Sequence, residues 1–368
     1  MNTKLEKSIE SLIDACASPG NAQKGAFQPT ITVGLEEPIC WVKLFGCDMK
    51  RFYTDALYHA EQVIKYKLWR FRNIPDDAPP DASLNASFGY YNEYTVCGMD
   101  VKFNDDGVPL IETGHPLTRT PDLSLLEPVD FYESGCMPRL LKWYKELEDI
   151  TDNRLAVRMA AWWRGPLDLA VQLRSYENLM SDATENPGFL HGLMHWLTEQ
   201  RMAWFTAYNK HFGLPNAPMG IGDDWINIPF ISPGFFEEFV LPYYRILENF
   251  HGGISGVHSC GNQLLIQPFL MSLPTIRGLE VSPWTNLELT LKQVPEDYFL
   301  VISSHPNDIL YSGPEAIREK LSRVRALCEG RKYALVTSGL TPKPGPFCET
   351  EFLTKIHIWL DVAKDIFH

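Results

Sequence analysis

The chain is expected to fold as an α/β protein, a (β/α)8 TIM barrel with extra helices at its N-terminal end. From residue 130 onward, short apolar runs typical of buried strands alternate with longer segments of helical periodicity. The alternation never changes to hairpins, so it predicts a parallel sheet covered by helices. A chain of 368 residues is long enough for one such barrel, and the strand count reaches about eight if the region before residue 130 supplies two strands. A doubly wound open sheet is the competing architecture, but the sequence contains no glycine-rich dinucleotide fingerprint or phosphate loop to support it.

We expect the chain to form a single domain. In it, residues 1–80 are expected to be helical decoration and residues 81–368 are expected to form the barrel. Residues 1–80 are typical of helices around an apolar run at 39–44. Residues 84–103 contain strand-like stretches, and Asn104–Gly107 is typical of a turn.

The remaining elements follow in order from the periodicity and from capping signals. Ser232-Pro233 is typical of an N-cap followed by a proline in the first turn, and Ser312-Gly-Pro-Glu315 is typical of a capping box. The expected helices cover residues 130–148, 166–181, 187–211, 233–249, 313–330 and 350–367, with one more after residue 262. The expected strands cover residues 155–161, 219–221, 254–257, 277–281, 298–303 and 333–337.

Composition and charge narrow the class of partner. The formal net charge is −13 and there is no block of lysine or arginine, which argues against nucleic acid and against an anionic membrane surface. No run is long enough to cross a bilayer, and the charged start of the chain does not resemble a signal peptide. The eight cysteines show no framework spacing, so we expect reduced thiols and a cytoplasmic location. A small molecule or another protein is the expected partner, and the oligomeric state, a homodimer included, stays open.

The stretch His258-Ser-Cys-Gly-Asn262 follows a short buried strand. A histidine and a cysteine two apart on an extended chain project to the same side, as a pair of soft ligands for zinc would. Alone the pair is weak evidence, because Cys260 could equally be a small core residue. Cys348, in a loop after the last strand, and Glu280, at the end of another strand, strengthen it. Residues just past the carboxyl ends of barrel strands converge on one mouth.

Further polar residues follow other strands and are expected at the same mouth. Trp163 and Arg164 come after the strand at 155–161, and Arg164 could bind an anion or pair with an acid. Asp223, Asp224 and Trp225 follow the strand at 219–221, and the acids are expected to serve a site rather than only cap a loop. His305 follows a later strand, and it could contact a substrate or cap the next helix.

One histidine and two cysteines with a fourth position open, or loosely filled by Glu280, have the character of a catalytic zinc site. Structural zinc sites use short paired spacings, whereas Cys348 lies 88 residues after Cys260. Two thiolates and an imidazole leave zinc electron-rich. Such a site suits a zinc-bound thiol that attacks an electrophilic methyl group.

Several motifs together resemble the uroporphyrinogen decarboxylase superfamily over roughly residues 130–368. Within it the chain is most similar to the zinc-dependent methyltransferases that work with corrinoid proteins, such as methylcobamide:coenzyme M methyltransferase. The motifs are Gly165-Pro-Leu-Asp-Leu-Ala-Val-Gln-Leu-Arg174, Tyr176-Glu-Asn-Leu179, Gly222-Asp-Asp224, Ile231-Ser-Pro233, Phe236-Glu-Glu-Phe-Val-Leu-Pro-Tyr-Tyr244 and His258-Ser-Cys-Gly-Asn262.

The resemblance implies the same barrel, with His258, Cys260 and Cys348 as zinc ligands and Glu280 on the metal before a thiol arrives. It also implies that Asp223 or Asp224 positions substrate or a proton. Arg164, Trp163, Trp225 and His305 are the candidates for substrate contact. The chain has no Asp-x-His-x-x-Gly signature for cobalamin, so the corrinoid is expected on a separate partner protein.

The expected function is therefore zinc-dependent transfer of a methyl group between a corrinoid protein and a small thiol or a methoxylated or methylthiolated compound. A metal-free decarboxylase of porphyrinogen type is the alternative, although the arginine-rich N-terminal segment of those enzymes (Arg-Gln-Ala-Gly-Arg) is missing. A non-catalytic relative that binds a ligand or partner is the third reading.

Overall fold

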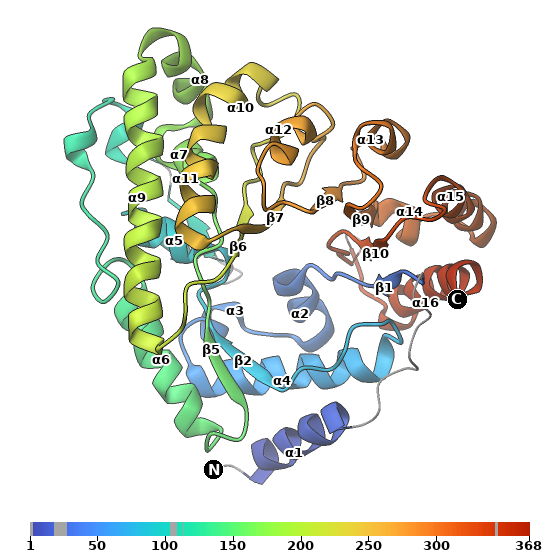
Figure 1. Cartoon of the computed structure of the whole chain (residues 1–368). Coiled ribbons are helices and arrows are strands. Elements are labelled where there is room, and N and C mark those ends of the chain that lie inside the picture. The colour runs from blue at the N-terminus through green and yellow to red at the C-terminus, as the bar shows by residue number, and fades with distance from the viewer. Residues whose placement is uncertain (1–2, 18–27, 104–108, 113, 343–344) are drawn as a thin grey trace.

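Eight parallel strands follow one another in chain order around a common axis, with helices between them, in the computed structural model of the chain (Figure 1). The structure describes residues 3–17, 28–103, 109–112, 114–342 and 345–368. The eight strands are β1 (Thr30–Thr32), β2 (Ser83–Ala86), β5 (Ala156–Met159), β6 (Met219–Gly222), β7 (Ile254–His258), β8 (Gly278–Val281), β9 (Phe299–Ser304) and β10 (Tyr333–Thr337). This order agrees with the predicted (β/α)8 barrel.

The ladder of the sheet runs through β8, β9, β10 and β1, and two further parallel pairs join β2 to β5 and β6 to β7. A parallel bridge between Arg164 and Gly222 links the end of β5 to β6. Strands β7 and β8 pack side by side. The pairing of β1 with β10 joins the beginning of the sheet to its end.

Helices connect the strands and cover the outside of the sheet. Among the described residues they are α1 (Thr3–Ala17), α2 (Glu37–Phe45), α3 (Met49–Phe52), α4 (Ala56–Asn73), α5 (Asn92–Val96), α6 (Met137–Ile150), α7 (Pro166–Arg174), α8 (Tyr176–Glu185), α9 (Pro187–Phe212), α10 (Pro233–Phe239), α11 (Leu241–His251), α12 (Gln267–Met271), α13 (Leu287–Gln293), α14 (Pro306–Leu310), α15 (Pro314–Leu327) and α16 (Glu349–Phe367). Short 3-10 turns lie at Gly89–Tyr91, Pro116–Thr118 and Leu123–Leu125, and β3 (Val101–Phe103) pairs antiparallel with β4 (Pro109–Ile111).

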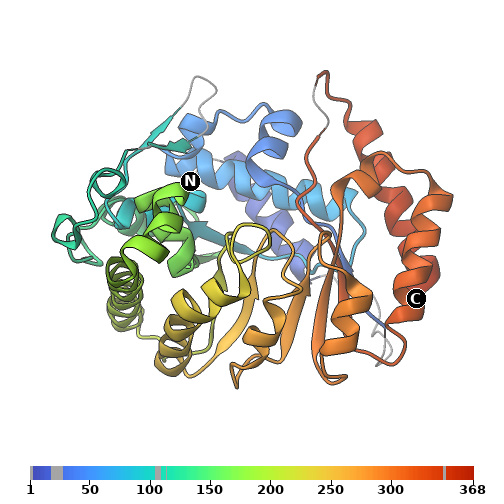
Figure 2. The ribbon, with the colours of Figure 1, turned by 90° about the horizontal axis from the view of Figure 1, so that it is seen from above.

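The C-terminal end of α4 approaches the C-terminal helix α16 (Figure 1 and Figure 2). Trp69 Nε1 donates to Glu349 Oε1 at 2.6 Å, and His357 Nε2 lies 2.6 Å from the carbonyl oxygen of Asn73. The segment 1–80 was expected to be helical decoration, but it also supplies strand β1 to the sheet. The expected turn at 104–107 lies outside the described residues.

Three local expectations differ from the structure. The helix expected over 166–181 breaks at Ser175, whose φ of 71° lies in the left-handed region. The helix expected over 233–249 breaks between α10 and α11, where Pro242 occupies the first turn of α11. The first turn of α15 is capped by Gly313 without a side-chain hydrogen bond, so the capping box predicted at Ser312 does not form.

The capping prediction at Ser232 is confirmed, since its Oγ accepts from the backbone N–H of Phe235 at 3.1 Å. The eight cysteines are all free thiols, as expected. No helix in the described part of the chain combines the length and the apolar character that a bilayer span requires.

Candidate metal centre

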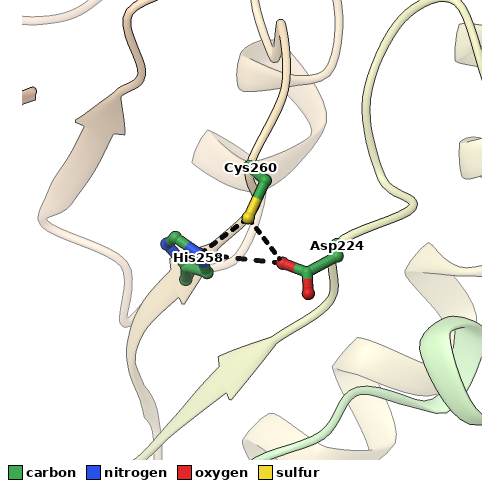
Figure 3. Close-up of side chains that lie close together, drawn as sticks. All are labelled: Asp224, His258 and Cys260. Carbon is green, nitrogen blue, oxygen red and sulfur yellow. Dashed lines mark hydrogen bonds and ion pairs between the residues drawn. The ribbon is translucent and has the colours of Figure 1, made fainter. Parts of the chain in front are cut away.

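Three potential metal ligands meet at the carboxyl ends of β6 and β7. His258 ends β7, Cys260 follows two residues later, and Asp224 lies two residues past β6. Cys260 Sγ lies 3.1 Å from Asp224 Oδ1 and 3.5 Å from His258 Nε2, and 3.6 Å separates His258 Nε2 from Asp224 Oδ1 (Figure 3). A tetrahedral zinc ion with bonds of about 2.0–2.3 Å separates its ligand atoms by roughly 3.3–3.8 Å. The three atoms therefore stand close to the spacing that such an ion needs.

Two charged neighbours hold the ligand side chains in this orientation. Glu280 Oε2 lies 2.6 Å from His258 Nδ1, which leaves Nε2 to face the cluster. Arg164 Nη1 donates to Asp224 Oδ2 at 2.8 Å, which leaves Oδ1 to face it. Carboxylates behind a metal-bound histidine orient the ring and raise its basicity. The geometry fits a metal site whose ligands are already oriented by neighbouring charges.

The backbone of β6 and β7 sets the distance between the acid and the histidine. Gly222 and His258 are partners in the parallel ladder, and the N–H of Asp223 donates to the carbonyl of His258 at 2.9 Å. Asn227 Nδ2 donates to the carbonyl of Asp224 at 2.6 Å. A Cβ at Gly261 would lie 2.1 Å from Asn227 Oδ1, so only glycine fits directly after Cys260. The loops after the two strands are thereby locked together.

Neighbouring side chains shift the pKa values of both His258 and Asp224. Hydrogen bonds with Cys260 and Glu280 raise the pKa of His258 to about 10. Burial raises the pKa of Asp224, but hydrogen bonds from Arg164 and Cys260 outweigh burial and bring it below its ordinary value. Metal ligation requires a neutral imidazole and a thiolate, so a metal that binds here displaces protons.

Cys348 was expected to be the third ligand, and the structure does not bring it into the cluster. It is exposed at the N-cap position of α16, and it does not belong to the group formed by Asp224, His258 and Cys260. Asp224, expected as a catalytic acid, is the third member of this group. The sequence did not indicate its place there, because two adjacent acids give no signal of which one faces the neighbouring strand.

The structure places Glu280 and Asp223 differently. Glu280 Oε2 bonds to the nitrogen of His258 that faces away from Cys260 and Asp224. Asp223 is fully buried, and its Oδ2 accepts from Tyr244 Oη at 3.1 Å and from the N–H of Leu167 at 3.2 Å. Burial raises the pKa of Asp223 well above its ordinary value. The contact with Leu167 places this carboxyl at the start of α7.

The other expected substrate contacts separate into two groups. Trp163 is 44% exposed and lies against β6, where a Cβ at Gly222 would stand 1.9 Å from its Nε1. Arg164 is at the cluster, as described. Trp225 stacks on Tyr176 with ring centroids 5.1 Å apart, and His305 Nδ1 accepts from the N–H of Asn307 at 3.0 Å, so His305 caps α14.

Sequence reasoning missed two acids that support Arg164. Asp168 Oδ2 accepts from Arg164 Nη1 at 2.9 Å and from Tyr94 Oη at 2.7 Å, and burial raises the pKa of Asp168 to about 6. Glu93 Oε1 accepts from the N–H groups of Trp163 at 2.5 Å and Arg164 at 3.2 Å. The spacing of four residues from Arg164 to Asp168 could have indicated the first pair. No local signal marks Glu93.

A cavity of about 510 Å³ lies beside Arg164, between β2 and the segment that follows β5 on one side and the helices α2, α3 and α4 on the other. Trp163 and Arg164 belong to its wall.

Comparison with known proteins adds a family and a fold. Residues 83–339 match the family model described as uroporphyrinogen decarboxylase (URO-D). No curated protein sequence matches the chain. A solved structure of a methyltransferase from Methanosarcina mazei superposes with a TM-score of 0.65 over 99% of this chain and 99% of its own, at 16% sequence identity. At that identity the likeness shows the fold alone.

Proposed function

Since the chain belongs to the uroporphyrinogen decarboxylase family, we propose that it is a zinc-dependent methyltransferase of that family, which moves a methyl group between a small molecule and a corrinoid carried by a partner protein. The observation that carries the proposal is the cluster of Asp224, His258 and Cys260, whose ligand atoms face one point while Arg164 and Glu280 hold the opposite atoms. The solved methyltransferase shows that a protein of this fold can carry out methyl transfer.

The donor set favours one direction of transfer. With a carboxylate in place of the second expected thiolate, the protein ligands of the metal are harder, that is, less polarisable. A metal held by harder ligands is better suited to bind a substrate through oxygen. Zinc held by these residues would act as a Lewis acid on the oxygen that carries the methyl group. We therefore propose removal of a methyl group from a methoxylated substrate rather than methylation of a thiol.

The balance of the reaction is simple. The bond between the methyl carbon and the substrate oxygen breaks, and its electron pair stays on oxygen. A reduced corrinoid, when one is bound, would supply the electron pair for the new bond to carbon. The oxygen then takes a proton from solvent. In this chain, Arg164 and Glu280 keep the ligand side chains in place throughout.

The mouth of the barrel offers a surface for the corrinoid protein. Several large apolar side chains are exposed on the loops and helices that follow β7, β8 and β9: Leu265 is 53% exposed, Trp284 54% and Tyr311 58%. We propose that these exposed side chains belong to the surface that contacts the corrinoid protein, because large exposed apolar side chains are common at protein interfaces. The free thiols support the expected reducing compartment, the cytoplasm.

The test is the metal content of the protein after incubation with zinc and removal of the excess. We expect about one zinc per chain in the wild type and in Cys348→Ser, and loss of zinc in Cys260→Ser and Asp224→Asn. Asp224→Asn keeps a partner for Arg164, so its loss of zinc would report ligation rather than misfolding. Wild-type protein that binds no zinc would overturn the proposal. Loss of zinc in Cys348→Ser with retention in Asp224→Asn would restore the thiolate-rich site.

A further inference from the structure

The two carboxylate oxygens of Asp224 have different neighbours. Oδ1 lies 3.1 Å from Cys260 Sγ, within the cluster, whereas Oδ2 accepts a hydrogen bond from Arg164 Nη1 at 2.8 Å and points away from Cys260 and His258 (Figure 3). A carboxylate can bind a metal ion through one oxygen or through both. While Arg164 holds Oδ2, only Oδ1 is available to a metal in the cluster.

Arg164 divides one of its nitrogens between two acids. Nη1 donates to Asp224 Oδ2 and also to Asp168 Oδ2, which lies 2.9 Å away. A terminal guanidinium nitrogen carries two hydrogens, so each acid accepts one of them and both acids fix the position of Nη1. The side chain of Arg164 is 12% exposed and that of Asp168 is 2% exposed. Little water therefore reaches this contact, and a hydrogen bond between charged groups is stronger where water is excluded.

Asp168 is the inner end of this arrangement. It lies in the first turn of α7, and its Oδ2 also accepts from Tyr94 Oη of α5 at 2.7 Å. The ring of Tyr94 lies 5.4 Å from the guanidinium carbon of Arg164. Arg201 Nη1 donates to the carbonyl of Arg164 at 2.9 Å, which holds the backbone of Arg164 as well. These contacts form a continuous chain from α5 and α7, through Arg164, to Asp224.

Asp168 also opposes the charge of Arg164. A guanidinium group stays positive in proteins, and a positive charge beside a metal site repels the metal. Burial raises the pKa of Asp168 to about 6, so at pH 8 its carboxyl group is ionised. Arg164 can then hold Asp224 without adding an uncompensated positive charge next to the cluster.

We propose that Asp168 is a positioning residue of the candidate metal centre. It keeps Arg164 on Oδ2 of Asp224, so Asp224 offers the metal one oxygen and leaves one position of the metal open for substrate. This inference rests on the proposed function, and it adds the residue that keeps the site open.

Cobalt(II) in place of zinc tests this role, because the visible spectrum of cobalt depends on how many ligands it has. Three protein ligands and one solvent molecule make a four-coordinate ion with intense d–d bands, and a fifth ligand weakens these bands. We expect intense bands in the wild type at pH 8. In Asp168→Ala, Arg164 loses its anchor and Asp224 can bind through both oxygens. The d–d bands should therefore lose intensity, while the charge-transfer band of the Cys260 thiolate remains. Equal d–d intensity in the wild type and Asp168→Ala would overturn the proposal.

Asp182→Ala is the matched control, because it truncates another buried acid that pairs with an arginine. Asp182 is 5% exposed, and its Oδ2 lies 2.6 Å from Arg174 Nε. Arg174 also donates to the carbonyl of Leu117 and not to a member of the cluster. Asp182→Ala should keep the wild-type spectrum. The same loss of intensity in Asp182→Ala as in Asp168→Ala would overturn a specific role for Asp168.

Two further variants separate the hydrogen bond of Asp168 from its charge and from folding. Asp168→Asn keeps an acceptor for Arg164, so it should restore the intense bands but bind cobalt about tenfold more weakly, because the charge of Arg164 is no longer opposed. Weak bands in Asp168→Asn would overturn positioning through the hydrogen bond. Asp168→Ser is a second truncation, for the case that Asp168→Ala does not fold, and it should give weak bands too. Circular dichroism verifies the folding of each variant.

Crystal structures of the metal-free wild type and Asp168→Ala separate this inference from the proposed function. Asp224 Oδ2 should stay on Arg164 in the wild type and leave it in the variant. Wild-type protein that takes up neither zinc nor cobalt, with Asp224 displaced only in Asp168→Ala, would overturn the proposed function and leave the positioning of Asp224 by Asp168. Metal uptake by the wild type, with the same Asp224 position and equal cobalt spectra in both proteins, would overturn this inference alone.

Discussion

The two ring nitrogens of His258 have different partners, and this division leaves one of them toward the candidate ligands. Nδ1 lies 2.6 Å from Glu280 Oε2, and Nε2 faces Cys260 and Asp224. Without Glu280 the ring could rotate and either nitrogen could face the cluster. The acid selects one orientation of the ring, and when the ring is neutral it favours the tautomer with its proton on Nδ1.

Replacement of Glu280 by glutamine tests this orienting role. Glu280→Gln keeps the size of the side chain and removes its charge, so zinc affinity should fall by about 10- to 100-fold while about one zinc still binds at saturation. Competition with a chromophoric chelator measures the affinity. Complete loss of the site would instead make Glu280 a ligand, and unchanged affinity would leave it without a role.

His59 is a second histidine whose surroundings decide its charge. It is 4% exposed, and it lies between Phe52 and Trp143 with ring centroids 4.4 and 4.9 Å away. Neither ring nitrogen has a hydrogen-bond partner. The carbonyl groups of Phe52 and Asn85 oppose the effect of burial only weakly, so burial lowers the pKa of His59 to about 4.

His59 therefore makes stability depend on pH. Its pKa is lower in the folded chain than the ordinary 6.5 of an unfolded one, so its contribution is complete above pH 6.5 and is lost as the pH falls toward 4. A difference of 2.5 pH units corresponds to about 3 kcal/mol. Chemical denaturation of His59→Leu should show a smaller loss of unfolding free energy between pH 7 and 4 than the wild type, by up to that amount. The exposed His195→Gln should behave as the wild type, and an equal acid sensitivity of His59→Leu and wild type would contradict the argument.

Strand β6 shows how one element serves both the fold and the site. The ring of Trp163 lies against Gly220 and Gly222, and the buried Asp223 bonds to the start of α7. Asp224 then emerges at the mouth. The strand and the two residues after it therefore contact the cavity wall through Gly220 and Gly222, support α7 through Asp223 and place the candidate ligand Asp224.

Gly222→Ala tests the contact between β6 and the cavity wall. The new Cβ would lie 1.9 Å from Trp163 Nε1, so the indole must move or the strands must separate. We expect a loss of about 1–3 kcal/mol in unfolding free energy, as for other overpacked sites. Gly234→Ala on α10 is the control, because its Cβ would meet only Ser232 Oγ at 3.9 Å, and it should leave the unfolding free energy nearly unchanged. Unchanged stability in Gly222→Ala would show that Trp163 is free to move.

At the scale of the whole molecule, α1 and the candidate metal centre lie at opposite ends of the strands. Glu10 of α1 lies 3.6 Å from Arg154, just before β5 begins, whereas the ligands follow the carboxyl ends of β6 and β7. The residues Leu5, Ile9 and Leu12 of α1 are buried, and α1 packs on α4. The packing of α1 and the candidate ligands thus lie at opposite ends of the barrel.

Ile9→Ala tests that separation. Truncation of this fully buried side chain should lower the free energy of unfolding by about 2–5 kcal/mol, while the zinc content of the folded protein stays at that of the wild type. The exposed Lys7→Ala should change stability by less than about 0.5 kcal/mol. Reduced zinc content in folded Ile9→Ala would show that the two ends are coupled.

Local patterns in the sequence were enough to predict the class of fold and to bring two candidate ligands together. Alternation of apolar runs predicted the parallel strands, and the spacing of His258 and Cys260 placed both on one side of an extended segment, since side chains in a strand alternate with a period of two. The third member of the cluster depended on tertiary structure. Nothing local in the sequence decides between Asp224 and Cys348, whereas the ladder between β6 and β7 brings Asp224 beside His258 and Cys348 lies at the N-cap of α16 outside the cluster. The cavity was likewise decided by folding, because its two walls come from helices and strands that meet only in the folded chain.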